Sequence, residues 1–250
     1  VPMASVWSKK MLMWANARLP LHKVGSGDLT CYPMLELLAK TNKPIILSTG
    51  LSSLSEVESA VSFIDRCNPS YVAERKLALL QCTSSYPTPD ADANLQAMLT
   101  LKNEFGLPVG YSDHTLGSDA VEAAVTIGAE IIEKHFTDTR EGKTFRDHLI
   151  ALTKEEVKDT LNRMRRISVL MGGGQKVLTK SEIEAGHHIS FRRSLYAGAN
   201  IKAGEIFTAN NLTFLRPRHG ICASCFEDIL GRVAKRDLLC HEVLQEGDLV

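Results

Sequence analysis

The sequence lacks an excess of charge of either sign and lacks long hydrophobic runs. Its 250 residues carry 29 Lys and Arg against 29 Asp and Glu, so the formal net charge is zero. This balance leaves no basic excess for a nucleic acid partner, and no block of like charges that would predict a disordered tail. No apolar run approaches the roughly 20 residues that span a bilayer, so we expect no membrane partner.

The sequence also lacks a cluster of cysteines: the six cysteines are scattered through apolar or loop contexts. Scattered thiols favour a reducing compartment, and we expect a cytoplasmic protein. Cys222 and Cys225 form a CxxC pair, but no second pair of Cys or His stands at zinc-site spacing, so we interpret them as two unconnected thiols. The sequence contains neither a dinucleotide-binding glycine fingerprint nor a Ser-His-Asp pattern for nucleophilic catalysis.

Short apolar runs alternate regularly with amphipathic stretches. The apolar runs predict strands at 2–6, 21–25, 44–49, 77–82, 108–112 and 130–135, and the stretches between them predict helices at 8–18, 32–41, 55–67, 91–105 and 118–128. A capping-box signature, Thr153 and Glu156, opens a further helix to about Met171. Strands that alternate with helices predict an α/β fold with a parallel sheet or barrel. Because a closed barrel of this type has about eight strands, we expect residues 1–175 to form an incomplete (β/α)8 TIM-type barrel without its first strands.

The pattern changes after the barrel. Residues 176–188 read as a polar linker, and residues 189–250 as a small β-rich domain of short strands and turns. This domain contains an internal repeat, 199–212 against 236–249, in which apolar positions such as Ile201 and Leu238 coincide and Glu205 matches Glu242. The short period indicates an internal pseudo-two-fold axis within one domain.

Two of the predicted strands lead into a histidine. His114 follows the run 108–112 and His135 ends the run 130–135, with a predicted helix between them. A strand–helix–strand unit brings both strand ends to one rim of a parallel sheet, where α/β barrels place their active sites. Two neutral imidazoles at such a rim suit a divalent metal. The alternative is that each histidine caps its strand and bonds to a neighbouring loop.

The other loops after predicted strands are rich in small hydrogen-bond donors. Lys23 and Ser26 flank a glycine after the second strand, Ser48 ends the third, and Ser84 and Tyr86 follow the fourth. Glycines, hydroxyls and an ammonium at one rim allow close approach to an anion. Each loop alone could instead be a tight turn that faces solvent. Together with the histidines, they predict a pocket for a small anionic ligand beside a metal.

These segments, taken in order, resemble a known family. The motifs are Lys-Val-Gly-Ser-Gly-Asp at 23–28, Leu-Ser-Thr-Gly at 47–50, Gln-Cys-Thr-Ser-Ser-Tyr-Pro at 81–87, Gly-Tyr-Ser-Asp-His-Thr at 110–115 and Glu-Lys-His-Phe-Thr at 133–137. They resemble the sialic acid synthases, also called N-acetylneuraminate synthases. The repeat region, with Asn-Leu-Thr-Phe-Leu-Arg-Pro at 211–217, resembles the antifreeze-like (SAF) domain of the same enzymes.

The resemblance implies a C–C bond-forming transferase. Such an enzyme condenses phosphoenolpyruvate with an N-acetylated hexosamine, N-acetylmannosamine or a relative, to a sialic-acid-type nonulosonate and phosphate. By position, it implies that phosphoenolpyruvate is contacted by Lys23, Ser26, Ser48, Ser84, Tyr86 and Ser112. It implies a divalent metal on His114 and His135, usually Mn²⁺, with Mg²⁺ and Co²⁺ as alternatives. Asp147 matches a position near the sugar, and Arg216 matches a residue that reaches into the partner's barrel in a domain-swapped homodimer.

In the family, a catalytic Glu lies on the first barrel strands, which have no counterpart in this sequence. No general acid or base is therefore assigned, and we expect no synthase activity from residues 1–250 alone. Two alternatives remain open. One is a legionaminic, pseudaminic or 9-phosphate-forming synthase of the same family, and the other is a non-catalytic carbohydrate-binding homologue.

Overall fold

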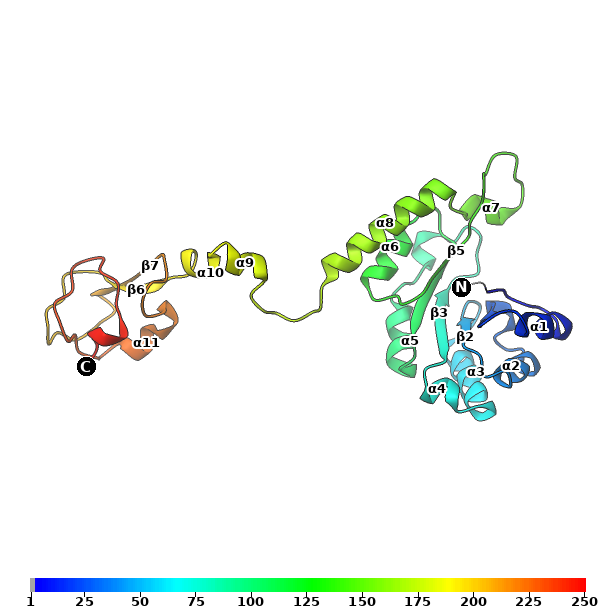
Figure 1. Ribbon diagram of the computed structural model, residues 1–250, viewed down its shortest axis with the longest axis horizontal. Coiled ribbons are helices and arrows are strands. Elements are labelled where there is room, and N and C mark those ends of the chain that lie inside the picture. Colours follow the sequence, from blue (N-terminus) through cyan, green and yellow to red (C-terminus); the bar gives the residue numbers. More distant parts are fainter. Residues whose placement is uncertain (1–2) are drawn as a thin grey trace. The chain divides into compact units, whose positions relative to one another are not determined.

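The computed structural model describes residues 3–250. The chain divides into two compact units, one ending at Gly173 and the other running from Gly174 to Val250 (Figure 1). Among the described residues, no helix is long and apolar enough to cross a membrane.

The first unit is built on a five-stranded parallel sheet in the order β1-β2-β3-β4-β5 (Figure 1). The strands are β1 (His22–Val24), β2 (Ile45–Ser48), β3 (Leu77–Cys82), β4 (Val109–Asp113) and β5 (Ile132–Lys134). Every residue of β1 to β4 is buried, as expected for a parallel sheet that is covered on both faces. The prediction of an α/β fold with an incomplete barrel is confirmed.

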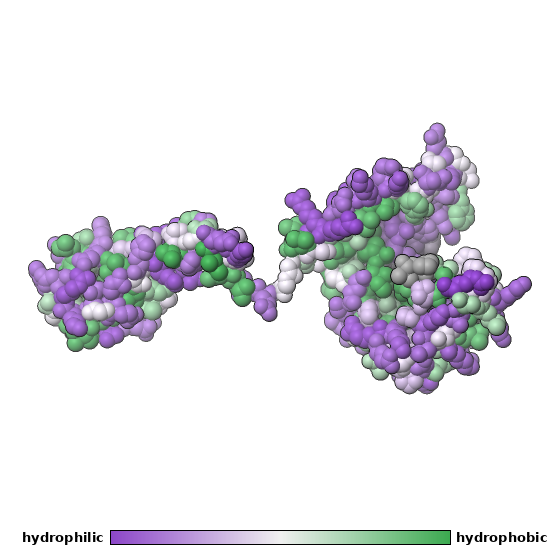
Figure 2. Space-filling model, viewed as in Figure 1, coloured by the Kyte–Doolittle hydropathy of each residue, from purple (hydrophilic) through white to green (hydrophobic). Residues whose placement is uncertain are grey.

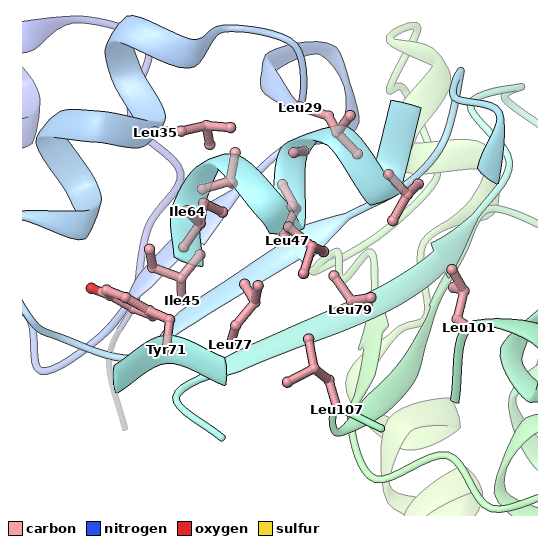
Figure 3. Close-up of a cluster of buried hydrophobic side chains, with 14 of the residues drawn as sticks. Leu29, Leu35, Ile45, Leu47, Ile64, Tyr71, Leu77, Leu79, Leu101 and Leu107 are labelled. Carbon is pink, nitrogen blue, oxygen red and sulfur yellow. The ribbon is translucent and has the colours of Figure 1, made fainter. Parts of the chain in front are cut away.

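Helices follow the strands and cover the outer face of the sheet. The longer ones are α1 (Lys9–Asn16), α2 (Tyr32–Ala39), α3 (Leu54–Cys67), α5 (Ala97–Phe105), α6 (Asp119–Thr126) and α8 (Lys154–Met171), and the short ones are α4 (Ser70–Ala73) and α7 (Arg146–Ile150). Capping boxes start α3 at Ser53 and, as predicted, α8 at Thr153. Figure 3 shows Leu35 of α2 and Ile64 of α3 packed over Ile45 and Leu47 of β2, which holds these helices against the sheet.

Both edges of the sheet differ from the prediction. The strand predicted at 2–6 is wrong in extent: Pro2 lies outside the described residues, and Ser5 forms a single parallel bridge with Lys23. At the other edge, Phe136 bridges Leu152, which was not predicted as a strand residue. Only three residues, Ile150 to Leu152, form the buried run here. A run this short shows no periodicity in the sequence.

The helix predicted at 91–105 begins later than expected, at Ala97. A 3₁₀ turn, Asp90–Asp92, precedes it, and Asn94 has φ of 45°. A left-handed residue cannot continue a right-handed helix, so the first part of this prediction is wrong.

The outer face of β5 is less completely covered than those of β2 and β3. All three residues of β5 are half-buried. A hollow of about 580 Å³ lies beside it, lined by apolar residues that include Val125 of α6 and Leu161 and Met164 of α8. Figure 2 shows hydrophobic residues, in green, along this side of α8.

The second unit is a small β-rich domain. It contains β6 (Ser194–Ala197), which pairs antiparallel with β7 (Leu212–Leu215), and the short helix α11 (Phe226–Ile229). The stretch read as a polar linker holds two short helices, α9 (Lys180–Glu184) and α10 (His187–Ser190). A capping box of Thr179 and Glu182 starts α9. Its Thr-x-x-Glu pattern was visible in the sequence.

The sequence repeat of this unit corresponds to repeated hydrogen bonds. The backbone N–H of Lys202 donates to Glu205 Oε2 at 2.9 Å, and that of Leu239 donates to Glu242 Oε2 at 2.8 Å. Ile201 and Leu238 exchange N–H···O bonds of 2.9 and 2.8 Å with each other. Each half therefore repeats the turn of the other, as the sequence repeat predicts.

Candidate active site

A cavity of about 370 Å³ opens at the carboxyl ends of the parallel strands. It is lined by Ser5, Trp7, Lys23, Gly25, Ser26, Ser48, Cys82, Tyr86, Ser112, His114, Glu133, Lys134, His135 and Asp147. Of the site residues predicted in the first unit, all except Ser84 are in this lining. Their roles in binding stay predictions.

Lys23 is the buried cation of the cavity, with 7% of its surface exposed. Its Nζ donates to Ser48 Oγ at 2.8 Å and to the Val24 carbonyl at 3.0 Å. It also lies 3.4 Å from Glu133 Oε2. Lys23 is on β1 and Glu133 on β5, the two outermost strands of the sheet. Their contact shows that the sheet curves, so that inward side chains from its two edges meet across the concave face.

The loops after β1, β2 and β3 pack closely at Gly50. The Gly50 N–H donates to Ser26 Oγ at 3.0 Å. A Cβ added at Gly50 would lie 2.5 Å from Ser84 Oγ and 2.8 Å from Ser26 Oγ, so a larger residue would displace these two hydroxyls. Ser84 thus lies close to this corner of the site, although it lines a neighbouring hollow of about 710 Å³.

His114 has a defined tautomer. Its Nδ1 lies 2.8 Å from the Thr83 carbonyl oxygen, which only accepts, so this contact assigns the proton to Nδ1 and leaves a lone pair on Nε2. The ring lies 4.1 Å from that of Tyr86 and 5.3 Å from that of His135, between centroids. A histidine that donates one N–H to a carbonyl presents its other nitrogen to a metal in many metal sites.

The second histidine lies next to acidic and aromatic groups. His135 Nδ1 is 3.8 Å from Asp147 Oδ2, on the first turn of α7. The guanidinium of Arg146 lies 4.6 Å above the centre of the Tyr86 ring. Within residues 3–250, no three His, Cys, Asp or Glu side chains gather as a metal-binding group. The two imidazoles fit a divalent ion whose remaining positions are open to oxygen ligands.

Two further groups of the cavity have shifted pKa values. Burial raises the pKa of the Tyr86 hydroxyl, and the negative charges at Cys82 and Asp147 add to this effect, so the phenol stays protonated as a donor. Burial also disfavours the Cys82 thiolate, but hydrogen bonding from His114 and from the Ser26 and Ser112 hydroxyls brings the pKa of Cys82 below its ordinary value.

Two residues of the cavity, Glu133 and Cys82, were not predicted as site residues. Glu133 has a visible signal, because in a strand the residue two positions before His135 lies on the same face. Cys82 ends a strand next to predicted site residues, but its apolar context indicated packing. Arg216 belongs to the second unit. There its exposed guanidinium lies 5.9 Å from the centre of the Phe191 ring.

Comparison with known families agrees with this arrangement. Residues 1–176 match the model of the NeuB family, and residues 192–250 match that of the SAF domain. The chain belongs to the NeuB family. It is 41% identical over 228 residues to the N,N'-diacetyllegionaminic acid synthase of Campylobacter jejuni, covering 91% of this chain and 66% of that protein. It is 33% identical to the pseudaminic acid synthase of the same species, over 91% of this chain and 64% of that protein. The NeuB chain therefore spans slightly less than two-thirds of these relatives.

Solved structures of NeuB-like proteins have the same fold. The N-acetylneuraminic acid synthetase of Leptospira borgpetersenii is 34% identical with a TM-score of 0.67, covering 74% of this chain and 62% of that one. A spore coat polysaccharide biosynthesis protein E from Chromobacterium violaceum is 25% identical with a TM-score of 0.80, covering 99% of this chain and 73% of that one. The second match covers both units of the NeuB chain.

Proposed function

We propose that this NeuB chain belongs to a synthase that condenses phosphoenolpyruvate with an N-acetylated hexosamine to a nonulosonate and phosphate. The observation that carries the proposal is the single cavity in which a buried ammonium, several hydroxyls and two histidines converge. The names of the relatives support the class of product, since they are legionaminic, pseudaminic and N-acetylneuraminate-type synthases. The proposal covers this class of product and does not choose among the three.

The Lys23 side of the cavity suits phosphoenolpyruvate. Lys23, Ser26, Ser48 and Ser112 supply one positive charge and three hydroxyls for its phosphate and carboxylate. Held in this way, the enol carbon C3 would face the histidines at the other side of the cavity, where the sugar aldehyde is to bind. Fixing both reactants in one orientation lowers the entropic part of the barrier.

The histidine side suits the sugar carbonyl. A divalent ion on His114 and His135, preferably Mn²⁺, would supply Lewis-acid polarisation of the aldehyde oxygen. The His114 Nδ1–H bond to Thr83 orients that ring with its lone pair available. In the proposed reaction C3 bonds to the aldehyde carbon, water adds to C2, and phosphate leaves with cleavage of its C–O bond. In this proposal, Asp147 accepts hydrogen bonds from sugar hydroxyls.

The test is calorimetric binding of phosphoenolpyruvate to the chain and to Lys23→Met. We expect the variant to bind about 10- to 100-fold more weakly, because a charge-assisted hydrogen bond contributes about 1.5–3 kcal/mol. Lys40→Met is the matched control, since Lys40 is exposed directly after α2 and pairs with Glu36. Equal affinity in both variants would contradict the anion site. A chain that binds the amino sugar but not phosphoenolpyruvate would instead support the non-catalytic alternative.

A further inference from the structure

A buried ion pair stands directly before the two histidines. Lys134 Nζ lies 2.6 Å from Asp113 Oδ2, with 8% and 0% of the two side chains exposed. Asp113 and Lys134 are partners in the β4–β5 register and are the last residues of their strands. The residue that follows each of them is a histidine. His114 and His135 thus follow the two halves of one ion pair.

The ion pair holds the backbone on both sides of His114. Asp113 Oδ1 accepts from the Thr115 N–H at 2.9 Å, and Lys134 Nζ donates to the Thr115 carbonyl at 2.6 Å. The Tyr111 hydroxyl donates to the same Asp113 oxygen at 3.1 Å. His114 therefore lies between two residues that are tied to Lys134, the residue next to His135.

Stability alone is a weak reason for such a pair. The free energy lost when two charges leave water offsets much of their mutual attraction. Buried ion pairs therefore often stabilise a fold less than apolar residues of similar size. What the pair does provide is geometry, because an ammonium with three donors joins a carboxylate on β4 to the loop beyond it. A one-residue slip between the strands would break both contacts of Lys134, the one to Asp113 and the one to the Thr115 carbonyl.

We infer that Asp113 and Lys134 are positioning residues, which set the separation and orientation of the His114 and His135 rings for a divalent ion. The inference rests on the proposed function, because that function assigns the ion to the two histidines. By strand alternation, the side chains of Asp113 and Lys134 lie on the opposite face of the sheet from the two histidine rings, although Lys134 also borders the cavity. The pair would therefore act through the strand ends rather than as a ligand of the ion.

The experiment measures Mn²⁺ binding by electron paramagnetic resonance of the free ion. The main variant is Asp113→Asn with Lys134→Met, which removes both charges and leaves no buried charge unpaired. We expect a loss of affinity of about 10- to 100-fold, the range typical for groups that orient metal ligands. Lys134→Arg should retain most of the affinity. Arg163→Met, which breaks the α8–α6 contact with Glu122 away from the histidines, should retain all of it.

A second measurement needs no metal. In the metal-free chain, ¹⁵N spectra of the histidine rings should show His114 as the Nδ1–H tautomer, and the double variant should show averaged tautomers. Circular dichroism confirms that each variant is folded. A folded double variant with unchanged Mn²⁺ affinity and an unchanged His114 tautomer overturns the inference. If His114→Ala binds Mn²⁺ as the parent chain does, the proposed metal site fails instead, and the spectra still decide whether the pair orients the ring.

Discussion

Lys23 contacts groups of two kinds in the candidate site. It donates to the Ser48 hydroxyl and also lies 3.4 Å from the Glu133 carboxylate. A bound phosphate would compete with Glu133 for the same ammonium. Because 41% of the Glu133 side chain is exposed, water screens this pair and the competition is modest.

The change Glu133→Gln tests this competition. We expect phosphoenolpyruvate to bind about 1.4- to 5-fold more tightly, because an ion pair that water screens contributes about 0.2–1 kcal/mol. Titration calorimetry at fixed salt measures the effect, and Glu130→Gln, whose partner Lys102 lies on α5, is the control. Weaker binding in Glu133→Gln would show that this carboxyl contacts the ligand favourably.

At the scale of an element, strand β1 directs Lys23 to one face of the sheet and its two neighbours to the other. Lys23 points to the cavity, so His22 and Val24 face the helices by strand alternation. His22 is 1% exposed, and neither of its ring nitrogens has a hydrogen-bond partner among the described residues. Burial lowers the pKa of His22 and the positive charge of Lys43 lowers it further. This strand therefore requires a neutral imidazole.

The stability of the first unit should depend on pH through His22. The unfolded chain takes up a proton near pH 6.5, whereas the folded chain does so only at lower pH, so stability falls as the pH drops below about 6.5. Above about pH 6.5, His22 is neutral in both the folded and the unfolded chain, so it no longer makes the stability depend on pH. Thermal unfolding of the chain and of His22→Leu at pH 7.5 and 5.5 measures the effect. The parent should lose more of its melting temperature on acidification than the variant, and equal losses would refute the role of His22.

For the whole molecule, the second unit contributes one further predicted site residue, Arg216. Arg216 is exposed and, within residues 3–250, has no ion-pair partner. Its guanidinium lies over the Phe191 ring. The guanidinium presents a planar set of hydrogen-bond donors. We propose that the protein is a domain-swapped homodimer in which Arg216 contacts the amino sugar bound by the partner's barrel.

This assembly predicts two results. Light scattering should give twice the mass of one chain. Arg216→Ala should weaken binding of N-acetylmannosamine at least 10-fold and leave phosphoenolpyruvate affinity unchanged, because a fork of charged hydrogen bonds to the sugar is lost. Arg193→Ala is the matched control, since Arg193 is also exposed and lies over a phenylalanine, Phe214. A monomer in solution, or equal effects of the two variants, would show that Arg216 is an ordinary surface charge with no role in sugar binding.

The sequence by itself determined the order of the five strands and the longer helices, and it placed His114 and His135 at one rim. Both follow from local rules: apolar periodicity marks the elements, and a strand–helix–strand unit has one possible rim for its strand ends. The repeat in the second unit was equally visible, because both halves use the same glutamate-capped turn.

Tertiary structure alone decided which side chains meet across the sheet. Lys23 and Glu133 are 110 positions apart on the outermost strands, and only the curvature of the sheet brings them within 3.4 Å. The pairing of Asp113 with Lys134 likewise depends on the β4–β5 register. Curvature and register arise from the packing of all the helices on the outer face and from the twist of neighbouring strands, and no local stretch of sequence contains that information.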